Sequence, residues 1–375
     1  MKKIKVMNMI WSMKDGGAQQ IVLNYLRDFQ NDPDIEFRLC VYTSATNSKY
    51  DKEIKEKGYN VVYLNNPHTK IQIPYIKRFF QTRISQKTWI KAIHEYKPDI
   101  VHVHISGLLA DTMPGILQEN IPIRFDTLHS NPYRYKGRTK KVITDAFLKH
   151  GVIPICLTEE QMKMAKDWYG IEHCEILHNG IDVKNIQRKI ITKNEAREKF
   201  KITKDAFVII GVGRLNPIKR FDLLIRVFEK VKEKVSNAKL IIAGDGSERD
   251  NLLRIVNKLN LSQDVYFLGN IDNVIDLYCA ADVLAMPSYS EASPLVAIEA
   301  QVCGLRCVIS DGVPAESVIT SNTQKLYSNA TENDWCQALL SENYVGNPVA
   351  REEDYELHSV CRKLKNIYLK YFFRG

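Results

Sequence analysis

The sequence predicts an α/β protein built from two doubly wound domains, and three observations support this prediction. Short apolar runs, typical of buried parallel strands, alternate with helical stretches along the chain. The alternation is interrupted by a charged stretch at residues 184–204 and then starts again. The chain has 375 residues, 45% of them hydrophobic and 26% charged, which is enough for two separate cores.

The first half contains six predicted strands. The first, at residues 4–10, follows a basic start and is interrupted by Lys5 and Asn8. No small-residue cleavage site follows it, so we interpret it as a strand and not as a signal peptide. The other five strands are expected at residues 37–42, 61–64, 100–103, 123–127 and 152–157.

The second half repeats the pattern with five predicted strands, at residues 207–212, 240–243, 265–268, 283–286 and 307–309. Between the halves, Asn179-Gly180-Ile181-Asp182 is a turn signal. We therefore expect one domain at residues 1–183 and the other at 184–355. The tail from Tyr355 to Phe373 is rich in Leu, Tyr and Phe and predicts a helix that packs against a second surface.

Charge and cysteine usage exclude some classes of protein. The formal net charge of +9 is moderate and mixed, which does not favour nucleic-acid binding. The eight cysteines show no C-x-x-C or other metal spacing. Several lie in apolar runs, so we expect buried free thiols in a reducing cytoplasm. We expect no metal site and no membrane span, because no apolar run is long enough for one.

A basic stretch with aromatic residues runs from Lys70 to Lys91, and the next acid is Glu95. A second basic run occupies residues 134–141. Basic helices with aromatic side chains can lie on an anionic membrane surface, here the inner face of the cell membrane. A solvated helix with its aromatic side in the core explains the same pattern, and both interpretations remain open.

The segment from Pro287 to Ala300 is the most informative in the chain. It follows a predicted buried strand and places Glu291 in a loop and Glu299 in the next helix. Ser293 and Pro294 predict the start of that helix, as a cap and a first-turn proline. Ligands bind at the carboxyl ends of parallel strands, and a helix start favours an anion, so a diphosphate fits this place.

Two further strand-to-helix loops carry candidate residues. Gly16 and Gly17 follow the first strand and allow close backbone approach to a ligand, although a plain turn also explains them. Arg214 and Lys219 follow the strand at residues 207–212 and can neutralise a diphosphate as it leaves. Taken alone, two surface cations are weak evidence for a binding site. Together with Glu291 they favour a binding site.

Three histidines lie at the ends of predicted strands in the first half. His129 follows the strand at residues 123–127, and it can bind a ligand hydroxyl, help to move a proton, or be purely structural. His102 and His104 are on one strand, and we expect them to point to opposite faces and not to form a pair. Of these two, His104, nearest the strand end, is expected to lie closer to the cleft.

In combination, these motifs resemble the retaining glycosyltransferases of family 4, of the bacterial polysaccharide-biosynthesis type. They are Gly16-Gly17-Ala18, Asn179-Gly180-Ile181-Asp182, Gly213-Arg214-Leu215 with Lys219, Gly244-Asp245-Gly246, and Glu291 to Glu299. The resemblance spans nearly the whole chain in the same order. It implies the GT-B fold, in which two Rossmann-like domains face each other across a cleft. The second domain then binds most of the nucleotide sugar, the first binds the acceptor, and a helix at about 356–375 packs back on the first.

The resemblance also implies roles for individual residues. Arg214 and Lys219 would hold the donor diphosphate, Glu299 the ribose hydroxyls, and Glu291 the hydroxyls of the transferred sugar. Backbone groups would add contacts to the diphosphate, and their residues are Gly16, Gly17, Ser293, Pro294 and Leu295. His129 matches the histidine that many members place beside the transferred sugar. The catalytic set expected on this basis is Glu291, His129, Arg214 and Lys219.

The implied reaction moves a hexosyl or N-acetylhexosaminyl unit from a UDP-sugar to a growing glycan, such as a lipid-linked surface polysaccharide. The family is described as retaining without an established protein nucleophile, the departing phosphate taking the acceptor's proton. No D-x-D triplet stands in a strand-end loop, so no cofactor or divalent metal is expected. Ala292 and Arg220 depart from common family residues, which leaves the identity of the donor sugar open.

Two other functions remain open at this level. A sugar-nucleotide epimerase would need an acid and a base at the sugar and no acceptor. A non-catalytic partner of another transferase would bind the nucleotide sugar or serve as a scaffold, and a scaffold would have no need of Glu291, Glu299, Arg214 and Lys219. The acceptor, the linkage and the oligomeric state do not follow from the sequence.

Overall fold

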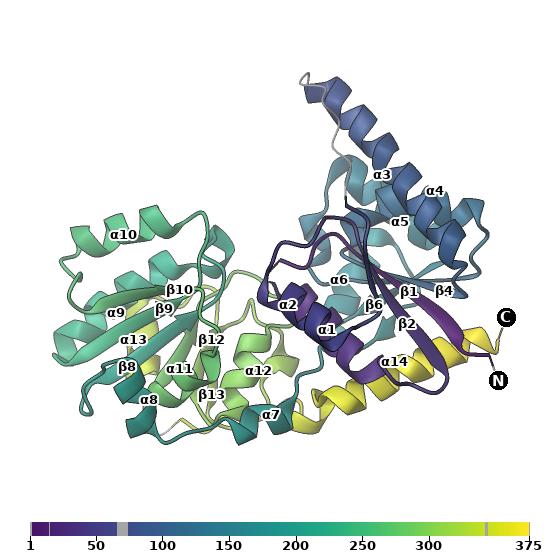
Figure 1. The fold of residues 1–375 in the computed structure, drawn as a ribbon. Helices are drawn as coiled ribbons and strands as arrows, with labels where there is room; N and C mark the ends of the chain where they lie inside the picture. Colours follow the sequence, from purple (N-terminus) through teal and green to yellow (C-terminus); the bar gives the residue numbers. More distant parts are fainter. Residues whose placement is uncertain (1, 15, 66–73, 342–343, 375) are drawn as a thin grey trace. The chain divides into compact units, whose positions relative to one another are not determined.

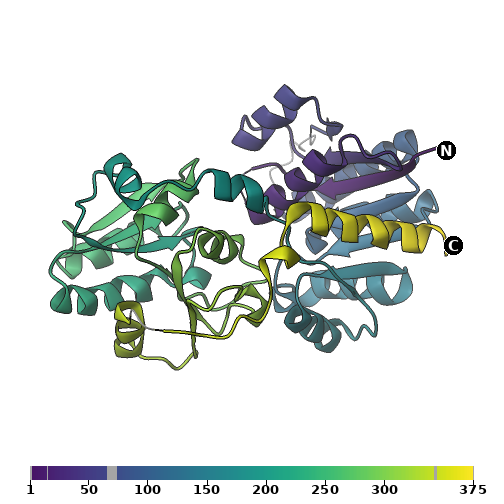
Figure 2. The same ribbon diagram turned by 90° about the horizontal axis from the view of Figure 1, so that it is seen from below.

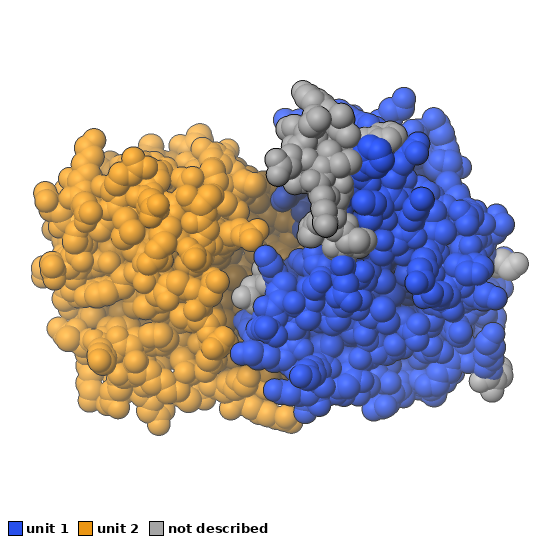
Figure 3. Space-filling model, turned by 45° about the horizontal axis from the view of Figure 1, so that its top comes forward, with its two compact units in different colours: residues 1–181, 356–375 blue, residues 182–355 orange. Residues whose placement is uncertain are grey.

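The chain forms two compact units. A computed structural model describes residues 2–14, 16–65, 74–341 and 344–374, with only the backbone given for 74–79. Unit 1 comprises residues 1–181 and 356–375, and unit 2 comprises residues 182–355 (Figure 3). The division falls between Ile181 and Asp182, within the predicted turn and two residues before the expected boundary.

Unit 1 is built on a parallel sheet of seven strands in the order β3-β2-β1-β4-β5-β6-β7 (Figure 1). The strand order reverses between β1 and β4, as in a doubly wound fold. The strands are β1 (Ile4–Ile10), β2 (Ile35–Val41), β3 (Val61–Tyr63), β4 (Ile100–His104), β5 (Ile123–Thr127), β6 (Val152–Cys156) and β7 (Glu175–Ile176).

Helices accompany this sheet. They are α1 (Gly17–Phe29), α2 (Lys49–Lys57), α3 (Pro74–Tyr96), α4 (Leu109–Gln118), α5 (Gly137–Lys149), α6 (Glu159–Tyr169) and α14 (Leu357–Phe372). The last of these comes from the end of the chain and lies beside α1 (Figures 1 and 2). Lys365 pairs with Asp32 at 2.9 Å, and Tyr368 is fully buried. The tail helix therefore belongs to unit 1, as the sequence predicts.

Unit 2 has a parallel sheet of six strands in the order β10-β9-β8-β11-β12-β13, and the order reverses between β8 and β11. Its strands are β8 (Phe207–Val212), β9 (Ala238–Ala243), β10 (Val265–Gly269), β11 (Val283–Met286), β12 (Arg306–Ser310) and β13 (Thr323–Leu326). Its helices are α7 (Val183–Arg188), α8 (Lys193–Lys199), α9 (Phe221–Lys234), α10 (Arg249–Lys258), α11 (Val274–Ala280), α12 (Leu295–Val302) and α13 (Glu332–Leu340).

All eleven predicted strands are present, and the prediction of a doubly wound α/β fold is confirmed. Two strands were missed, β7 and β13, which are the last strands of their sheets. Both are short, and most of their side chains are only partly buried. Because little of their surface is buried, these two strands need no apolar run, and an apolar run is the signal by which the other strands were recognised.

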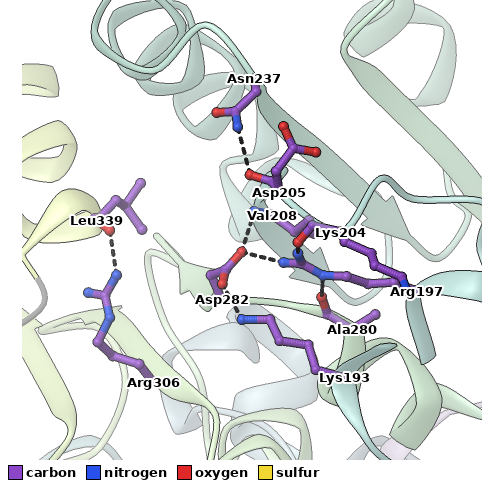
Figure 4. Close-up of polar contacts among 10 residues, drawn as sticks. All are labelled: Lys193, Arg197, Lys204, Asp205, Val208, Asn237, Ala280, Asp282, Arg306 and Leu339. Carbon is purple, nitrogen blue, oxygen red and sulfur yellow. Dashed lines mark hydrogen bonds and ion pairs between the residues drawn. The ribbon is translucent and has the colours of Figure 1, made fainter. Parts of the chain in front are cut away.

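A buried arginine fastens α8 to the amino ends of β8 and β11 (Figure 4). Arg197 is 4% exposed, and its Nη2 lies 2.9 Å from Oδ2 of Asp282. It also donates to the carbonyl oxygens of Ala280, at 3.1 Å, and of Lys204. Asp282 in turn accepts from the N–H of Val208 at 2.6 Å and pairs with Lys193. This network belongs to the framework of unit 2.

Six of the eight cysteine thiols are buried, and all eight are unpaired. Within the described ranges, no three or more His, Cys, Asp and Glu side chains are grouped so that they could hold a metal ion. The same residues include no helix with the length and apolar character needed to cross a membrane.

Candidate active site

In unit 2, the candidate residues lie where the strand order reverses. The loops after β8 and β11 leave the carboxyl ends of neighbouring strands, which is where open α/β sheets bind ligands. Arg214 and Lys219 lie on the first of these loops, and Glu291 on the second. Glu299 lies on α12, which follows the second loop.

The loop after β8 is held by backbone contacts with the loop after β9. The N–H of Gly213 donates to the carbonyl of Ala243 at 2.9 Å, and the N–H of Leu215 donates to the carbonyl of Asp245 at 3.0 Å. Gly244 has a φ of +130°, and a Cβ there would lie 2.0 Å from the carbonyl oxygen of Gly213. Only glycine tolerates this conformation and this approach. The Gly-Asp-Gly motif thus fixes the loop that carries the two cations.

The two loops meet in an ion pair between Lys219 and Glu291. Their Nζ and Oε1 atoms are 2.6 Å apart, and the side chains are 18% and 13% exposed. Asn216 orders the short turn before Lys219 by accepting from its N–H at 3.2 Å. The N–H of Glu291 donates to the carbonyl of Gly312 at 2.8 Å. Two side chains with different predicted partners, phosphate and sugar, are therefore adjacent.

Glu299 lies on the second turn of α12 and accepts from the hydroxyl of Tyr278 at 3.2 Å. Burial, followed by the charge of Glu299, raises the pKa of Tyr278 well above its usual range, so its hydroxyl remains a donor. Tyr278 lies on α11 in no recognisable motif, and sequence reasoning missed it. Its only signal is its place in an apolar helix.

The predicted start of α12 needs a small correction. The helix begins at Leu295, Pro294 is at the N-cap position, and that residue provides no side-chain cap. Pro294 is thus outside the first turn, and Ser293, which is buried, precedes the cap position. Since proline has no N–H, the first amide at this helix start is that of Leu295, whereas the N–H of Ala297 already donates to the carbonyl of Pro294 at 3.2 Å.

Arg214 is exposed on the loop after β8. The residue after Lys219, Arg220, adopts a left-handed conformation with a φ of +53°. Its guanidinium lies 4.4 Å from the ring centroid of Tyr289, a side chain that is 66% exposed. Arg220 and Tyr289 thus extend the charged loops at the surface of unit 2.

In unit 1, Gly16 and Gly17 lie where the sequence places them, between β1 and α1. Gly16 is the N-cap residue with extended backbone, and its carbonyl accepts from the N–H of Gln20 at 3.0 Å. A Cβ on Gly16 would lie 2.4 Å from Oε1 of Gln19, whereas Gly17 has open space around it. The first turn of α1 carries no acidic residue.

The expectation for His102 and His104 is wrong. Residues two apart in a strand project from the same face, because the pleat has a period of two. The two rings accordingly stack with centroids 4.1 Å apart. His104 contacts His129, with Nδ1 and Nε2 3.1 Å apart. Asn8, which sequence reasoning noted only as an interruption of β1, contacts His104 at 3.0 Å.

The basic stretch at residues 70–91 lies largely on α3, although Lys70 and the side chains of 74–79 are outside the described part. Arg83, Lys87 and Lys91 are exposed at a spacing of four residues and so share one face of the helix. Trp89 is fully buried and stacks on Tyr42 at 5.9 Å. This aromatic residue belongs to the core, as the solvated-helix alternative predicts.

Comparison with known proteins agrees with this architecture. Residues 15–185 match the model of glycosyltransferase family 4, and residues 192–338 match that of glycosyl transferases group 1. The uncharacterized glycosyltransferase MJ1059 of Methanocaldococcus jannaschii is 34% identical over 246 residues, covering 61% of this chain and 60% of that protein. The matched region thus spans about 60% of that relative's length.

Two more relatives are informative. The N-acetylgalactosamine-N,N'-diacetylbacillosaminyl-diphospho-undecaprenol 4-alpha-N-acetylgalactosaminyltransferase of Campylobacter jejuni is 34% identical over 138 residues, or 37% of this chain and 35% of that one. The crystal structure of HepE from Anabaena in complex with UDP-glucose has a TM-score of 0.80. It covers 98% of this chain and 100% of its own at 16% identity, so it supports the fold alone. With the two matched families and the two Rossmann-like units, the chain belongs to the family 4-type glycosyltransferases of GT-B fold.

Proposed function

We propose that this glycosyltransferase moves a hexosyl or N-acetylhexosaminyl unit from a UDP-sugar to a growing glycan, with retention at the anomeric carbon. The observation that carries the proposal is the 2.6 Å contact between Lys219 and Glu291. A cation suited to phosphate and a carboxylate suited to sugar hydroxyls are adjacent. Such a pair suits a substrate in which a sugar is joined to a phosphate, and this is the bond that the reaction breaks.

The remaining groups of unit 2 suit the rest of the donor. Arg214 is exposed and available to a phosphate oxygen. Glu299 accepts from the hydroxyl of Tyr278, and a carboxylate has acceptor capacity for the two ribose hydroxyls as well. Tyr278 then holds the carboxylate in position. The amide of Leu295 adds a hydrogen-bond donor for an anion.

The proposed chemistry needs no metal. Negative charge grows on the diphosphate as the glycosidic bond breaks, and Lys219 and Arg214 stabilise that charge. In the family-type mechanism the departing phosphate takes the acceptor's proton, while Glu291 and His129 orient the sugar. No protein nucleophile is invoked. A carboxylate already paired with a lysine at 2.6 Å is a weaker nucleophile than a free one, which fits this assignment.

Two comparisons support the finer parts of the proposal. HepE was crystallised with UDP-glucose, which favours UDP as the nucleotide. The Campylobacter relative is named for an acceptor on diphospho-undecaprenol, which favours a lipid-linked acceptor. The exposed bases of α3 (Arg83, Lys87 and Lys91) fit an anionic membrane surface. Replacing these three by glutamine should weaken binding to phosphatidylglycerol vesicles at low salt. Unchanged binding would remove the membrane part.

The first experiment is a thermal-shift panel of UDP, GDP, ADP and their sugars, because a ligand that binds only the folded state raises the melting temperature. UDP compounds should give the largest shift. Glu299→Ala should weaken UDP binding about tenfold or more, since it removes charge-assisted hydrogen bonds. The matched control is Glu198→Ala, an exposed glutamate on α8 in the same unit.

The outcomes separate the alternatives. A UDP shift that survives Glu299→Ala would reject the ribose assignment. A shift followed by release of a different UDP-sugar, without any acceptor, would identify an epimerase. No shift with any nucleotide would reject the proposed donor and favour a non-catalytic partner of another transferase.

A further inference from the structure

Unit 1 contains a chain of three hydrogen-bonding side chains that runs from the core to His129, one of the predicted site residues. Asn8 on β1 and His104 on β4 are fully buried, whereas His129, just after β5, is partly exposed. Oδ1 of Asn8 lies 3.0 Å from Nε2 of His104. Nδ1 of His104 lies 3.1 Å from Nε2 of His129. The chain thus connects the first strand with the end of the fifth.

The histidines in this chain are neutral at physiological pH. Burial lowers the pKa of His129 to about 4. Burial and the neighbouring histidines lower the pKa of His104 well below its usual range. A neutral imidazole donates from one nitrogen and accepts at the other, so each ring has a definite tautomer.

The partners determine these tautomers. An amide oxygen only accepts, so Nε2 of His104 carries the proton and donates it to Asn8. Nδ1 of His104 is then the acceptor, and Nε2 of His129 donates to it. The remaining nitrogen of His129, Nδ1, is left with a lone pair. No described residue hydrogen-bonds to that Nδ1.

We infer that Asn8 and His104 are positioning residues that hold His129 as its Nε2–H tautomer, so that Nδ1 accepts a hydrogen bond from a substrate hydroxyl. The inference rests on the proposed function, because it gives His129 a sugar or acceptor hydroxyl as its ligand. In this hydrogen bond the ligand hydroxyl is the donor and Nδ1 of His129 is the acceptor. An imidazole fixed with Nδ1–H would instead bind an oxygen that accepts.

The opposite orientation of the Asn8 amide would produce the opposite tautomers. If the amide of Asn8 were rotated by half a turn, its Nδ2 would donate to His104, and both rings would change tautomer. Nδ1 of His129 would then carry a proton. The side chain of Asn8 therefore decides what His129 offers to a ligand at the other end of the chain. Nδ2 of Asn8 is buried and has no partner among the described residues, so only the Oδ1 end is tied down.

His102 provides a matched control. It lies on the same face of β4, is equally buried, and stacks on His104 at 4.1 Å. Its nitrogens contact other groups, the hydroxyl of Tyr368 at 2.6 Å and that of Thr127 at 2.7 Å. It thus shares the surroundings of His104 and has no hydrogen bond to His129.

The test is long-range ¹H–¹⁵N NMR of the full chain without substrate, with His129 assigned by comparison with His129→Gln. The shift of a protonated imidazole nitrogen differs strongly from that of a bare one. The inference expects His129 as Nε2–H in the wild type and in Asn8→Asp, which keeps an acceptor. Asn8→Leu should give a mixture, and His102→Gln should leave His129 unchanged. Nδ1–H in the wild type would overturn the inference, and this result needs no variant to fold.

Release of UDP from UDP-glucose and UDP-N-acetylglucosamine gives the second readout. Asn8→Leu should lower kcat about tenfold with little change in the donor KM, whereas Asn8→Asp, which keeps an acceptor, should have a kcat close to that of the wild type. An unchanged kcat in Asn8→Leu would overturn the positioning role. It would leave the proposed function intact if the wild type still binds UDP and transfers sugar. Loss of UDP binding in the wild type would instead reject the proposed function.

Discussion

Two ion pairs lie at opposite edges of the same sheet in unit 2, and they differ in how far their hydrogen-bonding capacity is used. At the amino edge, Arg197 pairs with Asp282, and both are also bonded to backbone groups (Figure 4). At the carboxyl edge, Lys219 and Glu291 have one side-chain partner each among the described residues, namely each other. Burial alone does not separate them, because all four side chains are at most 20% exposed.

On this basis we expect the Arg197–Asp282 pair to be structural and the Lys219–Glu291 pair to bind the substrate. A buried pair whose donors and acceptors are all satisfied has nothing left to offer a ligand, and removing one partner leaves a buried charge. A pair with spare donors and acceptors can exchange its mutual contact for contacts to a substrate. The position in the fold agrees, because ligands bind at the carboxyl ends of the strands.

The largest effect should come from breaking the saturated pair. Arg197→Met should destabilise unit 2 by about 3 kcal/mol or more, because Asp282 loses its buried partner and two carbonyls lose a donor. Hydrogen exchange by mass spectrometry localises the loss to unit 2. Turnover per folded molecule should be unchanged. The control is Lys193→Met, which removes the exposed partner of the same aspartate and should cost less than about 1 kcal/mol.

Equal losses of stability in Arg197→Met and Lys193→Met would show that the network at Asp282 stabilises unit 2 no more than an exposed ion pair does. A fall in kcat with unchanged exchange would contradict the distinction between the two edges, because it would assign a role in turnover to the amino edge.

The next effect concerns turnover. Lys219→Met should lower kcat by about 10²- to 10³-fold, since it removes a cation that stabilises charge on the leaving diphosphate. Exchange in unit 2 should change little, and UDP affinity should fall less than kcat. The control is Lys239→Met. Lys239 pairs with Asp264 at 2.7 Å and is similarly half-buried, but it lies near the amino end of β9, away from the carboxyl ends of the strands. Equal losses of affinity and kcat would show that Lys219 only binds the donor.

The sequence predicted the elements of this site better than its contacts. Each glycine or charged motif follows a strand directly, so its position in the fold follows from the strand pattern. The contact between Gly213 and Gly244 also leaves a trace, because glycine is required there. The missed residues, Tyr278 and Asn8, are held by partners far away in the chain. A tyrosine in an apolar helix and an asparagine in a strand carry no local signal of those partners.

The error at His102 and His104 was of another kind. The period of a strand was available from the sequence and was applied wrongly. Their hydrogen bonds were not available, because they depend on strand order. β4 lies between β1 and β5, and only that order brings Asn8 and His129 to opposite sides of His104.

A third effect extends the comparison to unit 1, where a buried carboxyl group has no ion pair. Asp126 on β5 is fully buried. Burial raises its pKa well above the usual range, and the neighbouring Ser106 acts in the opposite direction. The folded protein therefore keeps Asp126 protonated at a pH where the unfolded chain has ionised it. Below the unfolded pKa of about 3.8 both states are protonated and no stability is lost. As the pH rises towards the folded pKa, stability falls by up to about 1.4 kcal/mol per pH unit.

Asp126→Asn removes this ionisation and should make unit 1 more stable than the wild type at pH 8, with the advantage shrinking towards pH 4. Denaturant unfolding across that range, with hydrogen exchange to assign the transition, measures the difference. The histidines contribute the opposite slope below pH 6.5, because burial lowers the pKa of His102 to about 3 and of His129 to about 4. They are present in both proteins, so the difference isolates Asp126. A constant difference at every pH would show that Asp126 ionises in the folded state. Burial would then have to be offset by a charge or donor near it, and unit 1 would resemble the ion-paired edges of unit 2.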